Sequence, residues 1–208
     1  IIGGGVSGYS AALEAKANKL NFLLLEASEP FSTIGNFPKG KPIFTYPKQM
    51  TPEGKITFSE SDFSHKDESN VGQPNKESLL QMLQTKVADA GIQHHIAHAS
   101  HVERKSGLMQ VILSQDEAPI KAHRVIIAIG RSGNFRKLGI EGEDSDKCIN
   151  RLHDPKLFSG KNLVIVGGGD SALEATIACC EAGANVTLCH RDSDFPLPKP
   201  VNIEKLTS

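Results

Sequence analysis

A glycine-rich hexapeptide occurs twice in the chain, and each copy stands between two apolar segments. In the second copy, residues 163–166 read Leu-Val-Ile-Val and residues 167–172 read Gly-Gly-Gly-Asp-Ser-Ala. An Ala- and Glu-rich stretch then leads to residues 185–189, which read Asn-Val-Thr-Leu-Cys. A short run of aliphatic residues is typical of a buried parallel strand, and a helix of about ten residues would return the chain to a second strand. We therefore predict one complete βαβ unit over residues 163–191.

The second hexapeptide fits the pattern G-x-G-x-x-G/A of dinucleotide-binding turns. Gly167 would turn the chain tightly, Gly169 would let the backbone approach a pyrophosphate, and Ala172 would allow close packing of helix against strand. The phosphates would lie at the helix N-terminus, beside Asp170 and Ser171, where free N–H groups and the helix dipole favour an anion. An ordinary tight loop is the alternative, but the flanking strands and helix favour a nucleotide.

The start of the chain repeats this pattern. Residues 1–2 are apolar, residues 3–8 read Gly-Gly-Gly-Val-Ser-Gly, and a predicted helix over about 9–19 leads to a strand over 21–26. We therefore predict an α/β chain with two Rossmann-like dinucleotide-binding domains, whose fingerprints lie about 160 residues apart. The residues of the first turn expected at the cofactor are Gly3, Gly5, Val6, Ser7 and Gly8.

The residues that end the second strand of each unit predict which nucleotide each site binds. Glu26 ends the strand in the first unit, and a carboxylate there accepts hydrogen bonds from a ribose diol while it repels a 2′-phosphate. His190 and Arg191 take the corresponding place in the second unit, where they supply donors and a fixed cation suited to a 2′-phosphate. The first site therefore indicates FAD or NAD, and the second indicates NADP. A solvated side chain is the alternative for Glu26 and, more strongly, for Arg191.

The segment between the two copies is expected to hold a long loop, a helix and a small antiparallel ribbon. Residues 27–75 are rich in Pro, Gly, Ser and Lys, and would form either a loop over a ligand or a surface loop. The spacing of the leucines predicts a helix over 76–90. Strands are predicted over 92–102, 109–113 and 121–129, with polar turns between them.

The last of these strands ends in small residues. Ala128 and Gly130 would let the backbone lie close to a cofactor, although an ordinary buried strand and turn is the alternative. The four histidines of the preceding ribbon, His94, His95, His98 and His101, lack an acidic or cysteine ligand beside them. Alternation along a strand would also put them on opposite sides, so we expect no metal.

The charge balance and the cysteine pattern exclude several classes of function. Lys and Arg number 23 against 24 acidic residues, without a basic run, so neither nucleic acid nor an anionic membrane surface is an expected partner. No apolar stretch approaches the ~20 residues of a membrane span. Cys179 and Cys180 are expected in a helix, at least one of them in the core, and Cys189 at the end of a buried strand. Such inert thiols are not a disulfide framework, which indicates a reducing cytoplasm.

With these features together, the sequence resembles the two-dinucleotide-binding flavoprotein oxidoreductases of the thioredoxin-reductase-like class. That class includes ferredoxin–NADP reductases and bacillithiol-disulfide-reductase-like proteins. The similarity covers nearly the whole chain and is specific at residues 3–8, 26, 125–130 and 167–191. The resemblance implies that the first fingerprint holds FAD, and that a second domain, inserted into the FAD domain, holds NADPH. It implies FAD contacts from Gly3, Gly5 and Gly8 to the pyrophosphate, Glu26 to the ribose, and the backbone of His101 and Val102 to the adenine.

Two positions depart from the pattern of that class. Thioredoxin reductases carry a C-x-x-C pair shortly before the second fingerprint, whereas this chain has residues 150–153 there without a cysteine, and only Cys148 nearby. A dithiol relay is therefore not expected, and a structural role is favoured for Cys148. At the phosphate clamp the class often has His-Arg-Arg, whereas Asp192 follows Arg191 here. An acid beside a 2′-phosphate would weaken the preference for NADP, with Lys199 as an offsetting cation.

We therefore expect an FAD-dependent NAD(P)H oxidoreductase, which passes hydride from NADPH to FAD and electrons to ferredoxin, flavodoxin, a low-molecular-weight disulfide or a quinone. The flavin carries this chemistry, so no catalytic side chain is named. Residues 1–138 are assigned to the FAD domain, with the β insertion at about 92–124, and residues 139–208 to the NAD(P) domain. Both are expected to be incomplete parts of a longer chain that forms a homodimer. A flavin-dependent monooxygenase and a nucleotide-binding protein without turnover are the alternatives.

Overall fold

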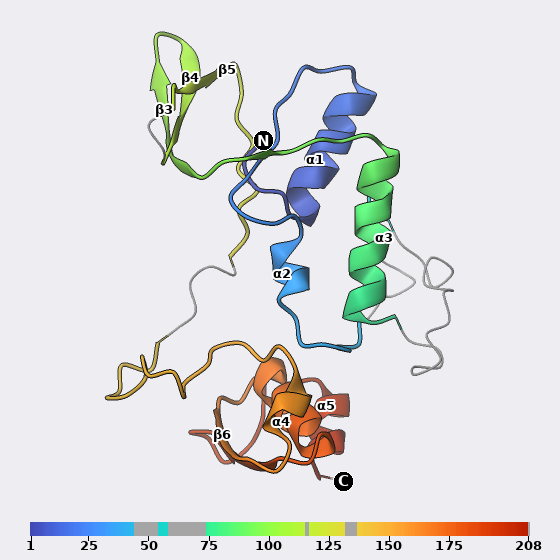
Figure 1. Cartoon of the computed structure of the whole chain (residues 1–208), viewed down its shortest axis with the longest axis vertical. Coiled ribbons are helices and arrows are strands. Elements are labelled where there is room, and N and C mark those ends of the chain that lie inside the picture. Colours follow the sequence, from blue (N-terminus) through green and yellow to red (C-terminus); the bar gives the residue numbers. More distant parts are fainter. Residues whose placement is uncertain (44–53, 58–73, 115–116, 132–136, 208) are drawn as a thin grey trace. The chain divides into compact units, whose positions relative to one another are not determined.

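The computed structural model describes residues 1–43, 54–57, 74–114, 117–131 and 137–207. The chain forms two compact units, unit 1 (Ile1–Asp144) and unit 2 (Ser145–Ser208), shown in Figure 1. Each unit contains one of the two glycine-rich turns and is described by itself. The predicted domain boundary after residue 138 lies within unit 1 and stays a prediction.

Unit 1 is built on a short parallel sheet. Strand β1 (Leu25–Glu26) pairs in parallel with β2 (His95–Ile96), and Ile2 makes parallel bridges to Leu25 and Ile127. Backbone hydrogen bonds of 2.9 Å from Ile2 N–H to the Ile126 carbonyl and from Leu25 N–H to the Ile1 carbonyl hold these neighbours together. The order across the sheet is therefore Ile127, Ile2, β1, β2, which brings the end of the chain's first segment beside the predicted strand end at Ala128.

Two helices, α1 (Val6–Ala17) and α3 (Lys76–Asp89), lie side by side in unit 1 (Figure 1). Helix α3 begins where the sequence predicts, because Asn75 caps it. The Asn75 side chain accepts a hydrogen bond from the Ser78 N–H at 2.9 Å, and the Ser78 hydroxyl accepts one from the Asn75 N–H at 3.0 Å. The predicted helix over 76–90 is confirmed, and α1 starts before its predicted first residue, 9.

The larger core of unit 1 contains side chains of both helices. The rings of Tyr9 and Phe31 stack with their centroids 4.9 Å apart, and Leu83 of α3 is 1% exposed. The short helix α2 (Ser32–Gly35) follows Phe31 directly. The predicted loop over 27–75 therefore starts with a buried anchor and a helical turn, whereas its residues 44–53 and 58–73 lie outside the described residues. The buried members of the cluster are Tyr9, Ala12, Leu24, Phe31, Ile34, Ile56, Leu79, Leu83, Val87 and Ile92.

The predicted antiparallel ribbon is confirmed as a three-stranded sheet of β3 (Ala99–Lys105), β4 (Leu108–Leu113) and β5 (Ile120–Ala122). Two strand predictions around it are wrong. The segment 92–102 is divided, because β2 belongs to the parallel sheet and β3 to the ribbon. The segment 121–129 is divided as well, because β5 ends at Ala122 and the chain rejoins the parallel sheet only at Ile127.

Unit 2 contains the predicted βαβ unit. Strand β6 (Asn162–Val166) pairs in parallel with β7 (Asn185–Cys189), and α4 (Asp170–Glu181) connects them. A 3-10 helix, η2 (Pro155–Phe158), precedes the unit, and helix α5 (Pro200–Thr207) follows it. Leu173 and Cys179 of α4 are 0% and 1% exposed, which confirms that one of the adjacent cysteines packs in the core.

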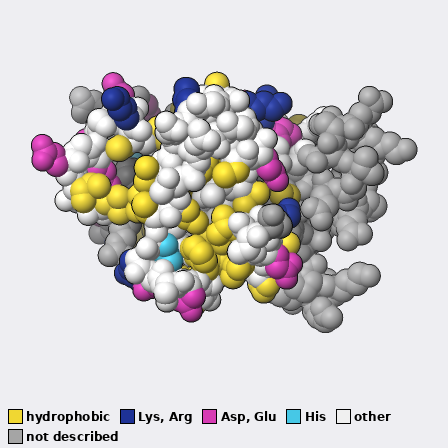
Figure 2. All heavy atoms as spheres, turned by 90° about the horizontal axis from the view of Figure 1, so that it is seen from below, with side chains coloured by type: hydrophobic (Ala, Val, Ile, Leu, Met, Phe, Trp, Pro, Cys, Tyr) yellow, Lys and Arg dark blue, Asp and Glu magenta, His cyan; other side chains and the backbone are white. Residues whose placement is uncertain are grey.

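The prediction that β6 and β7 are buried strands is wrong for one face of the two-stranded sheet. Val164 and Val166 of β6 are 67% and 54% exposed, and Cys189 at the end of β7 is exposed as well. Alternate residues are half-buried, so one face of the sheet is covered and the other is open. Figure 2, which views the chain from below with respect to Figure 1, shows hydrophobic side chains gathered in yellow.

Candidate functional site

The glycine-rich turn of unit 1 joins the parallel sheet to helix α1. The Gly3 N–H donates to the Leu25 carbonyl at 2.8 Å, which fixes the turn at the end of the sheet. Gly3 has φ +107°, and a Cβ there would lie 2.4 Å from the Ala128 carbonyl oxygen. A Cβ on Gly8 would lie 1.8 Å from the Gly3 carbonyl oxygen, so α1 packs directly on the turn. The backbone approaches at these two positions therefore require glycine.

Gly5 of the same turn faces open space. It is the N-cap of α1, no side chain caps the helix there, and a Cβ added to Gly5 would meet no atom within 4 Å. The first turn of α1, which contains Val6 and Ser7, thus combines backbone N–H groups that lack an intrahelical partner with the positive end of the helix dipole. These features fit a bound pyrophosphate.

Glu26 holds the turn through its carboxylate. Its Oε2 atom accepts a hydrogen bond from the Gly4 N–H at 2.6 Å, its Oε1 atom accepts one from the Ser28 N–H at 2.9 Å, and the residue is 8% exposed. The predicted position of Glu26 at the end of β1 is confirmed. Its hydrogen bonds to a ribose stay a prediction, and they would use the lone pairs that the two backbone donors leave over.

Phe31 belongs to this site, and the sequence analysis did not identify its role. Its N–H donates to the Gly4 carbonyl at 2.9 Å, its side chain is buried, and its φ is +57°. Phe31 therefore ties the segment after β1 to the glycine-rich turn. The available signal was the spacing of Phe31 and Ile34 in a segment rich in Pro, Gly, Ser and Lys, because large apolar residues there indicate a buried anchor.

The predicted strand end at Ala128 and Gly130 lies beside the first turn. The Ala128 N–H donates to the Ile2 carbonyl at 2.7 Å, and the Ala128 carbonyl is the group nearest to the added Cβ of Gly3. Gly130 follows with φ +68°, and a Cβ on it would meet no atom within 4 Å. The close approach at Ala128 is thus an approach to the glycine-rich turn, and the contact of Ala128 and Gly130 with a cofactor stays a prediction.

The turn of unit 2 has the same construction. The Gly167 N–H donates to the Cys189 carbonyl at 2.9 Å, and Gly167 has φ +144° with a Cβ that would lie 3.2 Å from the Ala172 Cβ. Gly169 is the N-cap of α4, no side chain caps the helix there, and a Cβ on Gly169 would meet no atom within 4 Å. The start of α4, with Ser171 exposed, therefore fits a second pyrophosphate.

His190 takes the place in unit 2 that Glu26 takes in unit 1. A Cβ on Gly168 would lie 2.1 Å from the His190 Cε1 atom, so the imidazole covers the middle glycine of the turn. The ring stacks on Phe195 at a centroid distance of 5.2 Å. Its Nε2 atom is 3.4 Å from Asp192 Oδ2, within ion-pair distance, but the two are not aligned for a hydrogen bond, and Nε2 is buried without such a partner among the described residues. Arg191 is mostly exposed.

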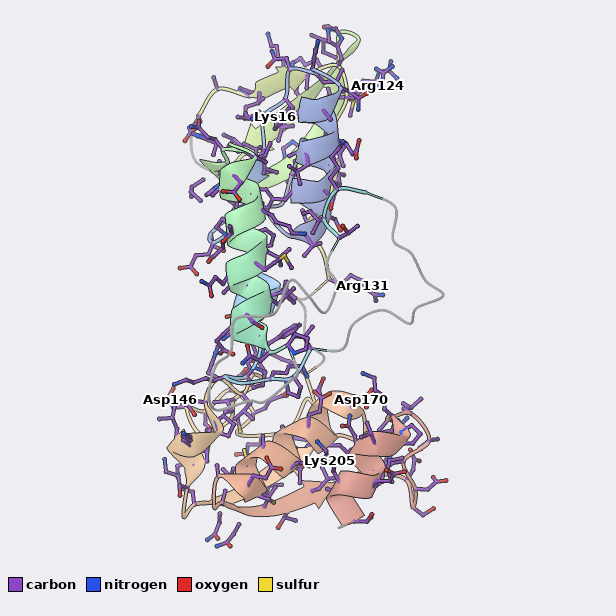
Figure 3. The ribbon with its side chains drawn as sticks, turned by 90° about the vertical axis from the view of Figure 1, so that its right-hand side faces the viewer. Lys16, Arg124, Arg131, Asp146, Asp170 and Lys205 are labelled. Carbon is purple, nitrogen blue, oxygen red and sulfur yellow. The ribbon has the colours of Figure 1, made fainter. Side chains whose placement is uncertain are left out.

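Asp170 connects the start of α4 to α5. Figure 3 labels Asp170 in unit 2, and its Oδ1 atom accepts hydrogen bonds from the Lys199 N–H at 2.8 Å and from the Asn202 side-chain amide at 2.7 Å. Asn202 is 6% exposed. The predicted cofactor contact of Asp170 stays a prediction. Its carboxylate also binds the N-terminal end of α5, which the sequence analysis did not predict.

Of the four histidines predicted in the ribbon, only His101 lies in a ribbon strand, β3, whereas His95 lies in β2 of the parallel sheet. His94 Nδ1 is 2.9 Å from the Tyr9 hydroxyl, and His98 Nδ1 is 2.5 Å from the Ser114 hydroxyl. Across the described part of the chain, no three His, Cys, Asp or Glu residues are grouped to hold a metal ion. Val102 packs against the second core cluster of unit 1. The predicted adenine contact by the backbone of His101 and Val102 stays a prediction.

The four cysteines all lie in described segments, and none forms a disulfide. Cys148 is exposed, and its N–H donates to the Ser145 carbonyl at 2.9 Å. Cys180 is exposed next to the buried Cys179. No helix in the described segments has the length and apolar composition needed to cross a bilayer.

The chain is similar in sequence and in fold to known proteins. The chain is 28% identical over 198 residues to a ferredoxin–NADP reductase of Ignicoccus hospitalis, covering 95% of this chain and 57% of that protein. It is 30% identical over 209 residues to a thioredoxin reductase of Helicobacter pylori, covering 98% of this chain and 58% of that protein. The solved structure of the bacillithiol disulfide reductase Bdr of Staphylococcus aureus superposes with a TM-score of 0.81 at 25% identity, covering 99% of this chain and 61% of that one.

These matches confirm the predicted α/β fold with Rossmann-like nucleotide-binding units, and the chain spans between half and two thirds of the length of the relatives it matches. The sequence model of the family described as pyridine nucleotide-disulphide oxidoreductase matches residues 1–200. Because this match covers nearly the whole chain, the protein belongs to the pyridine nucleotide-disulphide oxidoreductase family.

Proposed function

We propose that the protein is an FAD-dependent NAD(P)H oxidoreductase, with FAD at the turn of unit 1 and NADPH at the turn of unit 2. The observation that carries this proposal is the repeated geometry of the two turns. Each has a helix N-terminus without a side-chain cap and a glycine, Gly5 or Gly169, whose added Cβ would meet no atom within 4 Å. Two such sites in one chain of this family support two dinucleotides.

At the first site, the residues of the chain bind and orient the cofactor. Gly5 leaves room for a pyrophosphate at the start of α1, where Val6 and Ser7 supply backbone donors. Glu26 keeps the turn in this shape through its hydrogen bond to Gly4 and would accept hydrogen bonds from the adenosine ribose. The flavin supplies hydride acceptance and onward electron transfer when it is bound.

At the second site, Gly169 plays the same part at the start of α4. His190 covers the turn at Gly168, and Arg191 carries an exposed guanidinium at the end of β7 that would attract a 2′-phosphate. Unlike Glu26, Arg191 places a positive charge beside the ribose position. This difference supports FAD in the first site and NADPH in the second.

The electron acceptor is proposed to be a redox protein or a small molecule. Two relatives are named ferredoxin–NADP reductase and thioredoxin reductase, and their names support a redox-protein acceptor. The sequence has no C-x-x-C pair, so we propose that electrons leave the flavin without an internal dithiol relay. We also propose that the full-length protein is a homodimer, which light scattering after gel filtration would test. A cytoplasmic location is proposed as well, because none of the four cysteines forms a disulfide.

Anaerobic mixing of the FAD-loaded, full-length protein with NADPH and, separately, with NADH tests the proposed reaction. Loss of the oxidised-flavin absorbance band with either nucleotide is the expected result. A protein that purifies without flavin and takes up no FAD contradicts the proposal. A protein that binds FAD but is not bleached by either nucleotide is a nucleotide-binding protein without turnover.

The monooxygenase alternative differs in its use of oxygen. Flavin monooxygenases of Stenotrophomonas maltophilia share the fold at 18–21% identity, which does not separate the two functions. Oxygen insertion into a soft nucleophile, measured as product formed per NADPH consumed, would favour the monooxygenase. Steady NADPH oxidation with artificial acceptors and no oxygenated product favours the reductase.

A further inference from the structure

The Asp192 carboxylate lies between the two side chains that the second site offers to a 2′-phosphate. Its Oδ2 atom is 3.4 Å from His190 Nε2 and 3.4 Å from Arg191 Nε. Only the contact with Arg191 meets the geometry of a hydrogen bond. The guanidinium thus already has a carboxylate partner within the chain.

The segment that carries Asp192 is held at both ends. At its start, the His190 ring is stacked between Phe195 and the glycine-rich turn at Gly168. At its end, the Lys199 N–H is bound by the Asp170 carboxylate at the start of α4. These contacts keep Asp192 at the end of β7, beside the turn, where the adenosine ribose of a dinucleotide lies in a fingerprint of this kind.

We propose that Asp192 is the residue that limits the preference of the second site for NADPH over NADH. This inference rests on the proposed function, because it assumes that a nicotinamide dinucleotide binds at the turn of unit 2. The negative charge of Asp192 offsets the Arg191 guanidinium and repels a phosphate that carries close to two negative charges at neutral pH. An uncharged ribose diol escapes that repulsion, so the site accepts both nucleotides.

The chain contains a matched control for this charge. Asp194 is a second exposed carboxylate, two positions further along the same segment. Asp192→Asn and Asp194→Asn remove the same charge from the same segment with almost no change of side-chain shape. Only the first removes a negative charge that lies 3.4 Å from both His190 Nε2 and Arg191 Nε. A difference between the two variants therefore reports position rather than net charge.

The test is calorimetric titration of the full-length protein with adenosine 2′,5′-bisphosphate and with adenosine 5′-monophosphate, which differ only in the 2′-phosphate. Asp192→Asn is expected to tighten binding of the bisphosphate about tenfold, equivalent to about 1.4 kcal/mol. Binding of the monophosphate is expected to change by less than about twofold, since no charge is added at the 2′ position. Asp194→Asn is expected to leave both affinities within about twofold, because exposed charges further away are screened.

The possible failures are distinguishable. A wild-type protein that binds neither nucleotide overturns the second site of the proposed function, and this inference with it. A wild-type protein that binds both, with no gain in Asp192→Asn, overturns this inference alone. An equal gain in Asp194→Asn also overturns it, because the effect would then come from net charge.

Discussion

The Glu26 Oε2 atom accepts a hydrogen bond of 2.6 Å from the Gly4 N–H, so the residue that ends β1 holds the glycine-rich turn that precedes α1. Unit 2 repeats this relationship with different chemistry, because the His190 ring at the end of β7 covers Gly168 of the second turn. In both units, the residue that would meet the ribose is also the residue that shapes the turn. A substitution made at either position to change nucleotide selectivity is therefore expected to change the stability of the turn as well.

Glu26→Ala is expected to destabilise unit 1 by about 2–3 kcal/mol, because it leaves the buried Gly4 N–H and the Ser28 N–H without their charged acceptor. Urea unfolding of the full-length protein measures this change. Glu29→Ala is the matched control, since Glu29 is an exposed carboxylate in the same segment, and its effect should stay within about 0.5 kcal/mol. Equal stability of the two variants would show that the carboxylate does not hold the turn.

Gly5→Ser is expected to keep the fold and weaken FAD binding. The N-cap backbone of Gly5 is extended, so serine can cap α1 and raise stability by roughly a few tenths of a kcal/mol. Its side chain nevertheless enters the space left for the pyrophosphate. Gly8→Ala is the contrasting variant, in which a Cβ 1.8 Å from the Gly3 carbonyl costs about 1–3 kcal/mol despite the better helix propensity of alanine. Thermal unfolding and flavin content separate them, and tight FAD binding by Gly5→Ser would refute the site.

The turns could be predicted from the sequence because their geometry is local. Gly3 and Gly167 adopt positive φ, and glycine at fixed spacing between an apolar run and a helix is enough to indicate this. The partners of the turns could not be predicted. The hydrogen bond from the Phe31 N–H to Gly4, and the bonds from the Lys199 N–H and Asn202 to Asp170, depend on how segments distant in sequence come together.

The divided strand over 92–102 shows a second limit of sequence patterns. The His95 N–H donates to the Leu24 carbonyl and the Ala97 N–H donates to the Glu26 backbone carbonyl, both at 2.8 Å. These bonds make this part of the segment a parallel neighbour of β1. From Ala99 onward the chain pairs with β4 instead. Both sheets use the same two-residue alternation, so the pattern continues across the change of partner and gives no sign of it.

Cys180 is expected to react with iodoacetamide at least about tenfold faster than Cys179. Burial, and to a smaller extent the neighbouring Cys180, raises the pKa of the Cys179 thiol, so less of the reactive thiolate forms, and the side chain is 1% exposed. Mass spectrometry of the peptide that contains both residues, after timed alkylation, measures the ratio. Unfolding in denaturant should make the two rates similar, and comparable rates in the folded protein would contradict the packing of α4.

Tyr9 is expected to make unit 1 less stable at high pH. Burial, and then the charge of Glu26, raises the pKa of the Tyr9 phenol above its ordinary value of 10.0. In the unfolded chain the phenol ionises first, so the stability contributed by Tyr9 is complete below pH 10.0 and is lost as pH rises through the folded pKa. Unfolding of Tyr9→Phe followed between pH 8 and 11 should lack this loss, and an identical pH dependence of wild type and variant would contradict it.

Asp170→Ala is expected to release α5 from α4. It removes the acceptor of the Lys199 N–H and of the buried Asn202 amide, a loss of about 1.5–3 kcal/mol, whereas Asp170→Asn keeps an Oδ1 acceptor and should lose less than about 1 kcal/mol. Hydrogen exchange of the α5 amides is the direct measurement, because it reports local opening. Glu181→Ala removes an exposed carboxylate at the other end of α4 and serves as the control. Faster exchange of the α5 amides in Asp170→Ala alone would show that the Oδ1 acceptor holds α5 to α4. Exchange that is equally fast in Asp170→Asn and Asp170→Ala would show that the charge does so, and would contradict the prediction.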